Sequence, residues 1–179
     1  MVKKIVAIGP ESTGKSTLCE QLADLYKTSF CPEYAREFLL KNGPDYSYDD
    51  LLTIAKGQIS LEDEITRRVV KNASSTQFLF IDTDMSVMKV WCEFVFGKCH
   101  PFILDQITSR KYDLYLLCNT DLPWKADPLR EYPNPAPRQE LFHMYKDLLV
   151  NQSTPWKIVE GTMEQRNQSA VEAIGRFLK

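Results

Sequence analysis

The amino-acid sequence predicts an α/β fold in three layers, in which a parallel sheet of five strands lies between helices. Five short apolar runs recur along the 179 residues without polar alternation, which is typical of strands buried on both faces. Helical patterns fill the stretches between these runs, and this alternation favours a parallel sheet. A chain of this length suits one core, so we expect a single domain over residues 1–179.

The first predicted strand, residues 5–8, leads into a loop that reads Gly-Pro-Glu-Ser-Thr-Gly-Lys-Ser at residues 9–16. A helical pattern follows and ends near Tyr26. The spacing of the glycines and the lysine, between a strand and a helix, is that of a phosphate-binding loop. The fold we expect is therefore that of the phosphate-loop (P-loop) nucleoside triphosphatases, in the version found in nucleoside and nucleotide kinases.

The residue types of this loop suit a nucleoside triphosphate. Gly9 lets the chain leave the strand sharply, and Gly14 lets backbone amides approach phosphate oxygens without a Cβ clash. The Lys15 ammonium can reach the β- and γ-phosphates, while the Ser16 hydroxyl can bind the Mg²⁺ that bridges them. We expect the nucleotide contacts to come from Gly9, Glu11, Ser12, Thr13, Gly14, Lys15, Ser16 and Thr17.

The second predicted strand, residues 29–31, is short and is followed by Pro-Glu-Tyr-Ala-Arg at residues 32–36. In a kinase, Glu33 at the end of a strand could orient the attacking hydroxyl or accept its proton. A surface salt bridge between Glu33 and Arg36, three residues apart, is the alternative. The residues alone leave these two interpretations open.

A long helix is predicted to begin near Ser47, where Ser47 and Asp50 have the spacing of a capping box. Apolar residues then recur on one helical face. They are Leu51, Ile54, Leu61, Ile65 and Val69.

The third predicted strand, residues 78–81, ends in Asp82-Thr83-Asp84. Acids just past a buried strand are where many phosphate-loop proteins hold magnesium, so Asp82 is the expected partner of Ser16 at the metal. Either aspartate could also orient the acceptor hydroxyl. For Asp84 an equally supported alternative is the N-cap of the following helix, because Asp is a preferred capping residue.

The fourth predicted strand, residues 114–118, is followed by a segment that interrupts the alternation of strands and helices. Residues 119–139 hold five of the ten prolines together with Arg130 and Arg138. Ligands of open α/β sheets bind at the carboxyl ends of strands, and irregular loops this long are uncommon unless they are functional or disordered. We expect a catalytic lid whose two arginines close on the transferring phosphoryl group. A fifth strand at 156–159 and a closing helix at 163–178 complete the chain.

Composition limits the partners. The net charge is −2 and the pI is near 5.8, without a basic stretch dense enough for a phosphate backbone, so nucleic acid is not an expected partner. No apolar run is long enough for a membrane span, and we expect a cytoplasmic protein that acts on a small molecule. His100 and His143 lack a third metal ligand, and we interpret both as structural or exposed. Composition leaves the oligomeric state open.

Several motifs together resemble the NadR-type ribosylnicotinamide kinase domain. They are Gly-Pro-Glu-Ser-Thr-Gly-Lys-Ser-Thr at 9–17, Pro-Glu-Tyr-Ala-Arg-Glu at 32–37, Ile-Asp-Thr-Asp at 81–84, Lys-Val-Trp-Cys-Glu at 89–93 and Tyr-Asp-Leu-Tyr-Leu-Leu-Cys-Asn-Thr-Asp-Leu-Pro-Trp-Lys-Ala-Asp-Pro-Leu-Arg at 112–130. The resemblance runs over most of the chain, and the last motif is its most distinctive part.

This resemblance implies transfer of the γ-phosphate of ATP, with Mg²⁺, to the 5′-hydroxyl of nicotinamide riboside, which gives nicotinamide mononucleotide for NAD salvage. It also supports the lid, since Trp124, Asp127 and Arg130 lie in the longest motif. A pyridinium cation suits aromatic faces and carboxylates. The expected acceptor pocket is formed by Glu33, Tyr34, Arg36, Asp84, Trp91, Trp124 and Asp127, with Glu93 nearby.

The family's upstream adenylyltransferase and repressor functions are not expected, because the sequence lacks a His-x-Gly-His motif. One alternative is a phosphate-loop kinase for another nucleoside or nucleotide. Another is a regulatory ATPase or nucleotide switch, although the motifs of a GTPase switch are missing. The corresponding places read Asp-Thr-Asp-Met at 82–85 and Asn-Thr-Asp-Leu at 119–122, without the required glycine and lysine.

Overall fold

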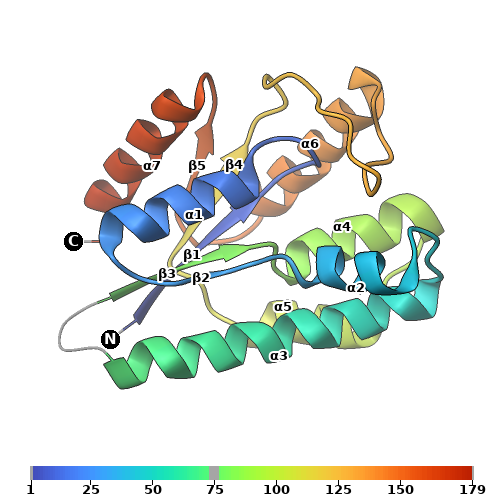
Figure 1. Cartoon of the computed structure of the whole chain (residues 1–179), viewed down its shortest axis with the longest axis horizontal. Helices are drawn as coiled ribbons and strands as arrows, with labels where there is room; N and C mark the ends of the chain where they lie inside the picture. The colour runs from blue at the N-terminus through green and yellow to red at the C-terminus, as the bar shows by residue number, and fades with distance from the viewer. Residues whose placement is uncertain (1, 73–76, 179) are drawn as a thin grey trace.

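The computed structural model describes residues 2–72 and 77–178, and these residues form one parallel sheet of five strands in the order β2-β3-β1-β4-β5 (Figure 1). All five predicted strands are confirmed. The first is longer than predicted because residues 2–4 pair with residues 77–79 of the neighbouring strand. The strands are β1 (Val2–Ile8), β2 (Phe30–Cys31), β3 (Gln77–Asp82), β4 (Leu114–Cys118) and β5 (Trp156–Val159).

Helices cover both faces of the sheet, as the three-layer prediction requires. Helices α1 (Lys15–Tyr26) and α7 (Met163–Phe177) lie on one face, and α3 (Tyr48–Asn72) and α6 (Pro135–Val150) lie on the other (Figure 1). Side chains of a strand alternate between the two faces. Ile5 and Ala7 of β1 accordingly pack under α1 and α7, whereas Val6 and Ile8 belong to the opposite core.

A third apolar cluster supports the site from beside the sheet. It packs α3 against α2 (Tyr34–Asn42), α4 (Met85–Phe96) and α5 (Pro101–Ser109). The capping box that begins α3 is confirmed, since Asp50 Oδ2 accepts the Ser47 N–H at 2.8 Å and Ser47 Oγ accepts the Asp50 N–H at 3.2 Å. The predicted apolar face of α3 is also confirmed. Leu51, Ile54, Ile65 and Val69 are buried, and Leu61 packs half-buried beside them.

The proline-rich segment is only partly a loop. Helix α6 begins at Pro135, so residues 135–139 of the predicted lid segment are helical and the irregular part covers residues 119–134. Proline suits the first turn of a helix because the N–H that it lacks would have no partner there. Arg138 is therefore carried by a helix, whereas Arg130 lies in the irregular part.

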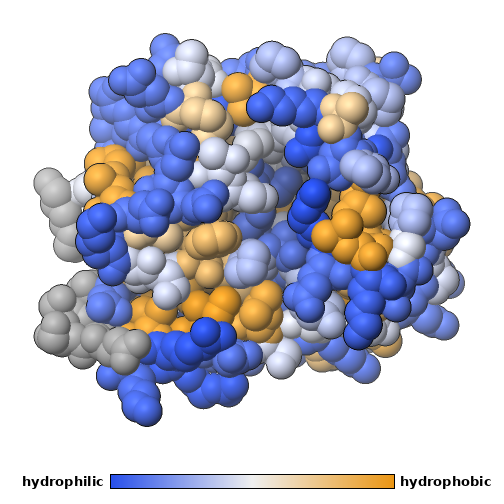
Figure 2. Space-filling model, in the orientation of Figure 1, coloured by the Kyte–Doolittle hydropathy of each residue, from blue (hydrophilic) through white to orange (hydrophobic). Residues whose placement is uncertain are grey.

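None of the helices in the described ranges is both long and apolar enough to cross a bilayer. On the face shown in Figure 2, hydrophilic side chains predominate and apolar ones form separate patches. The most exposed large apolar residues are Leu40, Val150 and Leu25, which are 66%, 60% and 59% exposed and lie on α2, α6 and α1.

Candidate active site

The phosphate-binding loop lies at the carboxyl end of β1 and is braced by its own atoms. Gly9 and Gly14 have φ values of 141° and 79°, in the region that L side chains rarely adopt. A Cβ atom at Gly9 would also lie 2.7 Å from the carbonyl oxygen of Cys118. The Pro10 carbonyl accepts hydrogen bonds from Thr13 Oγ1 at 2.7 Å and from Lys15 Nζ at 2.9 Å. The lysine ammonium is thus held across the loop.

Ser16 and Asp82, predicted from separate segments, meet beside this loop. They meet because β1 and β3 are neighbours in the sheet, with Ala7 opposite Asp82. Ser16 Oγ donates a hydrogen bond of 2.5 Å to Asp82 Oδ2, whereas the buried Oδ1 has no partner among the described residues. Burial raises the pKa of Asp82, although the ammonium of Lys15 and the Ser16 hydrogen bond oppose this rise.

This oxygen pair fits Mg²⁺. A magnesium ion is commonly held by one or two carboxylates together with substrate phosphates, and its ligands are oxygens. The unpartnered Asp82 Oδ1 and the Ser16 hydroxyl are such ligands, placed next to the phosphate loop. Within the described ranges no group of three or more His, Cys, Asp or Glu residues could bind a metal by itself.

Glu33 stands at the N-cap position of α2 and lines the cavity next to the phosphate loop. Thr83 Oγ1 donates to Glu33 Oε1 at 3.5 Å, and burial together with the nearby Asp82 carboxylate raises the pKa of Glu33. Arg36 pairs with Asp127 instead of Glu33, with Nη2 and Oδ2 2.9 Å apart. The described contacts therefore do not include the Glu33–Arg36 salt bridge that the sequence left open.

Asp84 has the contacts of a helix cap. Its Oδ1 accepts the backbone N–H groups of Ser86 and Val87 at 2.9 and 3.3 Å, and its Oδ2 accepts the Tyr115 hydroxyl at 2.8 Å. Asp84 is buried and does not line the cavity. The structure therefore corrects the expectation of Asp84 as an acceptor-binding residue and favours the capping interpretation.

Thr83 separates the two aspartates and is a residue that the sequence reasoning missed. Its φ of 77° is rare for a β-branched side chain, and such strained residues cluster at functional sites. Asp82 on one side of it bonds Ser16, and Asp84 on the other side caps α4. No sequence pattern marks a threonine for this conformation.

A cavity of about 440 Å³ opens from the phosphate loop between α2, α4, α6 and residues 127–132. Such a volume suits a small-molecule ligand. Its wall includes Tyr46 and Trp91, whose ring centroids lie 4.9 Å apart in an edge-to-face arrangement. Trp91 Nε1 donates to the Tyr46 hydroxyl at 2.8 Å, and this hydroxyl donates to Glu131 Oε2 at 3.0 Å. The cavity is also lined by Phe94, Tyr132 and Tyr145, which were not predicted.

Some predicted acceptor residues lie elsewhere. Tyr34 packs against α3, where a Cβ atom at Gly57 would lie 2.1 Å from its ring, and it does not line the cavity. Glu93 pairs with Lys89 one turn away on α4. Trp124 does not line the cavity either. The structure does place Glu33, Arg36, Trp91 and Asp127 in the cavity wall.

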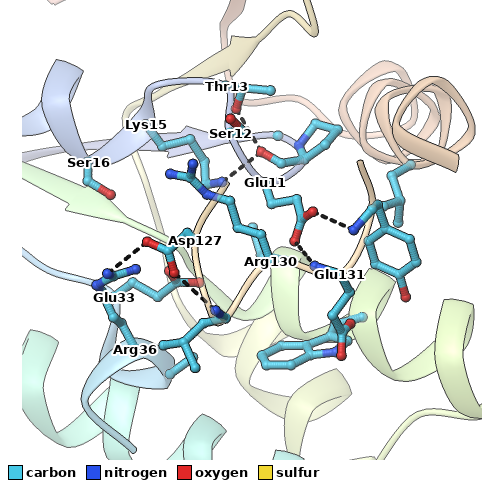
Figure 3. Close-up of a pocket in the computed structure, with 18 of the residues that line it drawn as sticks. Glu11, Ser12, Thr13, Lys15, Ser16, Glu33, Arg36, Asp127, Arg130 and Glu131 are labelled. Atoms are coloured by element: carbon cyan, nitrogen blue, oxygen red, sulfur yellow. Dashed lines mark hydrogen bonds and ion pairs between the residues drawn. The ribbon is translucent and has the colours of Figure 1, made fainter. Parts of the chain in front are cut away.

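The irregular segment 119–134 lies against the phosphate loop, and Figure 3 shows the Glu11 side chain bonded to its backbone. The Glu11 carboxylate accepts the backbone N–H of Glu131 at 3.0 Å and that of Tyr132 at 2.6 Å. It also accepts the Trp124 Nε1–H at 3.4 Å. Glu11 was predicted as a nucleotide contact; in the structure it lines the cavity, and its carboxylate bonds this segment.

The two predicted arginines lie next to the phosphate loop. Arg130 lines the cavity and donates from Nη1 to the Lys125 carbonyl at 2.5 Å. Arg138 is only 5% exposed, and its Nη2 donates to the Ser12 carbonyl at a long distance of 3.5 Å. Its buried Nε has no partner among the described residues. A guanidinium so poorly satisfied beside a phosphate loop is suited to an anion.

Arg166 of α7 is another residue that the sequence reasoning missed. It is fully buried and ion-pairs with Asp121. Its Nη1 donates to the carbonyls of Thr13 at 3.2 Å and Val159 at 3.1 Å, and its Nη2 donates to that of Asn119 at 3.2 Å. Arg166 thereby ties the phosphate loop to the ends of β4 and β5.

Comparisons with known proteins agree with this architecture. A family model described as an AAA domain matches residues 4–166. The trifunctional NAD biosynthesis/regulator protein NadR of Escherichia coli (strain K12) is 31% identical over 182 aligned residues, which cover 99% of this chain and 43% of NadR. The protein of the same name from Salmonella typhimurium is 30% identical and is covered to 41%. The chain thus spans less than half the length of these relatives.

Solved structures show the same fold. A crystal structure of NadR in complex with NR has a TM-score of 0.77 at 22% identity, covering 98% of this chain and 49% of that one. NadR in complex with NAD and AMP-PNP gives a TM-score of 0.74 with the same identity and coverage. A thymidylate kinase from Ehrlichia chaffeensis gives 0.65 at 12% identity, covering 97% of this chain and 98% of that one. The predicted phosphate-loop fold of the nucleoside and nucleotide kinase type is confirmed.

Proposed function

The chain belongs to the AAA-domain family, and we propose that it is a kinase that transfers the γ-phosphoryl group of ATP to the 5′-hydroxyl of nicotinamide riboside. The product would be nicotinamide mononucleotide, for NAD salvage. The observation that carries this proposal is a phosphate loop that opens into an aromatic-walled cavity, with the half-buried carboxylate of Glu33 in the wall. The NadR complexes with NR and with AMP-PNP support the choice of acceptor and of ATP.

At the nucleotide end, the loop amides and Lys15 bind the phosphates, with the lysine moving from the Pro10 carbonyl to the β- and γ-phosphate oxygens. Ser16 and Asp82 would hold Mg²⁺, which supplies positive charge to the phosphates. Asp82 has a free buried oxygen for this role.

At the acceptor end, Glu33 receives the proton of the 5′-hydroxyl as the hydroxyl oxygen attacks the γ-phosphorus, while the bond from this phosphorus to the β,γ-bridging oxygen breaks and ADP leaves. The raised pKa of Glu33 suits a group that must take up a proton during the reaction. The Thr83 hydroxyl, which donates to Glu33 Oε1, limits the orientations of the carboxylate. Thr83 thus serves as a positioning residue.

The cavity wall suits the cationic pyridinium ring of the acceptor. The rings of Tyr46 and Trp91 offer aromatic surface, and a cation over such a ring gains about 0.5–2 kcal/mol. The carboxylates of Asp127 and Glu131 also line the cavity. A neutral or anionic base would gain less from this combination.

The segment 119–134 together with the start of α6 acts as the lid. Arg130 and Arg138 neutralise the transferring phosphoryl group, and a well-placed arginine can contribute on the order of 10³-fold in rate. Closure of this segment on the phosphate loop excludes water and limits hydrolysis of ATP.

The test is to incubate purified protein with Mg-ATP and a panel of nucleosides and mononucleotides, and to detect the gain of one phosphoryl group by mass spectrometry. We expect nicotinamide mononucleotide well above every other product, and its loss in Lys15→Ala. A different labelled acceptor would contradict the substrate but keep the kinase. Hydrolysis of ATP without a labelled acceptor would indicate a nucleotide switch.

A nucleoside monophosphate kinase is the second candidate. The thymidylate kinase from Ehrlichia chaffeensis shares the fold over 98% of its length. The same panel of nucleosides and mononucleotides distinguishes the two candidates, since a nucleoside monophosphate kinase would convert a monophosphate into a diphosphate. The carboxylates of Glu33, Asp127 and Glu131 in the cavity wall favour a cationic acceptor over an anionic one.

A further inference from the structure

We propose that Glu11 is a positioning residue whose carboxylate holds the lid over the phosphate loop, and that it is not a ligand of the nucleotide. The inference rests on the proposed phosphoryl transfer, because it assigns the lid to that reaction. It adds a role that the phosphate-loop pattern does not specify, since the residue at this position of the pattern is variable.

The contacts of Glu11 all run to one segment. The consecutive N–H groups of Glu131 and Tyr132 donate to its two carboxylate oxygens at 3.0 and 2.6 Å, as in an anion-binding nest of backbone amides. The indole N–H of Trp124 donates at 3.4 Å from the other side of the same segment. Figure 3 shows Glu11 extending from the phosphate loop to the backbone beside Glu131.

Charge gives the reason for this arrangement. A free carboxylate beside the phosphates would repel them, so an acid inside an anion-binding loop is unfavourable unless its charge is neutralised elsewhere. Here the backbone amides of Glu131 and Tyr132 donate hydrogen bonds to the Glu11 carboxylate. Hydrogen bonds to a charged acceptor are stronger than neutral ones, so one side chain can hold a loop that has no helix or strand of its own.

The neighbouring Ser12 adds two more hydrogen bonds between the phosphate loop and the lid. Its Oγ accepts the Lys125 N–H at 3.0 Å, and its carbonyl accepts Arg138 Nη2 at 3.5 Å. Glu11 and Ser12 therefore hold the lid at residues 124–125 and again at residues 131–132. Arg130 lies between these two attachment points and bonds the Lys125 carbonyl. Loss of the Glu11 carboxylate would release the segment that positions Arg130.

The experiment compares wild type with Glu11→Ala, Glu11→Gln and Trp124→Phe by hydrogen–deuterium exchange and by steady-state kinetics. Gln keeps one acceptor oxygen but presents an N–H₂ group to a backbone donor, and Phe removes only the indole N–H. Glu20→Gln is the matched control, because Glu20 lies exposed on α1 and its side chain makes no hydrogen bond in the described part of the chain.

We expect amide exchange of residues 124–132 to rise about tenfold in Glu11→Ala, less in Glu11→Gln and least in Trp124→Phe, with Glu20→Gln unchanged. The kcat for phosphoryl transfer should fall about tenfold, while the Kd for AMP-PNP changes less than about twofold. The ratio of ATP hydrolysed to phosphoryl groups transferred to the acceptor should rise. Simple destabilisation of the fold would not cause this rise.

Unchanged exchange of residues 124–132 in Glu11→Ala would overturn the proposal. So would a large loss of AMP-PNP affinity with an unchanged lid, because that result would make Glu11 a nucleotide ligand. The exchange measurement needs no turnover. It therefore tests whether Glu11 holds the lid even if the acceptor is not nicotinamide riboside. Failure of the Glu11 proposal and failure of the proposed function are thus distinguishable.

Discussion

The nucleotide side and the acceptor side of this site are built in different ways. Thr13 and Lys15 bond the Pro10 carbonyl three and five residues away, so part of the bracing of the phosphate loop comes from the loop itself, although Arg166 and Asp82 add bonds from distant segments. The lid bonds of Glu11 instead join residues 113 to 121 positions apart. The comparison indicates that the chemistry of phosphate binding is local in the sequence, whereas acceptor choice and closure depend on long-range packing.

The largest effect is expected on the nucleotide side, for the Lys15→Ala variant. We expect kcat/KM for phosphoryl transfer to fall on the order of 10³-fold or more, because no other side chain of the loop carries positive charge to the phosphates. Amide exchange of the lid and the Tm should stay near wild type, since the Lys15 ammonium bonds the Pro10 carbonyl within the same loop. Substantial remaining turnover would contradict the assignment of the loop.

On the acceptor side, Glu33→Gln should lower kcat by about 10²-fold and leave the Kd for AMP-PNP nearly unchanged. The raised pKa of Glu33 means that the base is protonated, and inactive, at higher pH than an ordinary glutamate. In wild type, kcat should therefore fall as pH decreases through this raised pKa, and the Gln variant should lack that limb. A pH profile that is the same in both proteins would exclude Glu33 as the base.

The Asp84→Asn variant tests whether Asp84 stabilises the fold without taking part in the reaction. Burial raises its pKa to about 6, so the folded protein binds a proton more tightly than the unfolded chain, whose aspartates titrate near 3.9. Stability should therefore fall by about 2 kcal/mol as pH rises from about 4 to about 6. Asp84→Asn can still cap α4 and should lose this pH dependence.

The measurement for Asp84→Asn is urea unfolding at several pH values, with kcat recorded in parallel. Other buried acids contribute equally to both proteins, so the difference between the two curves reports Asp84. A kcat that falls as strongly as in Glu33→Gln would return Asp84 to the catalytic set.

The smallest effect is expected for Tyr46→Phe. The hydroxyl that accepts from Trp91 and donates to Glu131 is lost, while the ring stays. Loss of such hydrogen bonds costs about 1 kcal/mol, so KM for the acceptor should rise about fivefold with KM for ATP unchanged. A change in KM for ATP instead would place Tyr46 outside the acceptor wall.

Sequence reasoning predicted the elements whose signals are local. The phosphate loop, the five strands and the capped helix α3 follow from spacing, apolar runs and the Ser47–Asp50 box. It interpreted the prolines at residues 135 and 137 as part of an irregular loop, whereas they lie in the first turn of helix α6. Tyr34 and Trp124 were assigned to the acceptor pocket from their aromatic character, which does not specify the direction of a side chain.

The sequence by itself determined the α/β class and the place where phosphates would bind, because strand periodicity and loop glycines act over a few residues. Only the tertiary structure decided which carboxylate does what. Asp82 turns to Ser16, Asp84 caps a helix, Glu33 lines the cavity and Glu11 bonds the backbone of residues 131–132. These roles depend on backbone direction and on donors brought from distant segments. In the sequence all four residues are simply acids beside strand ends.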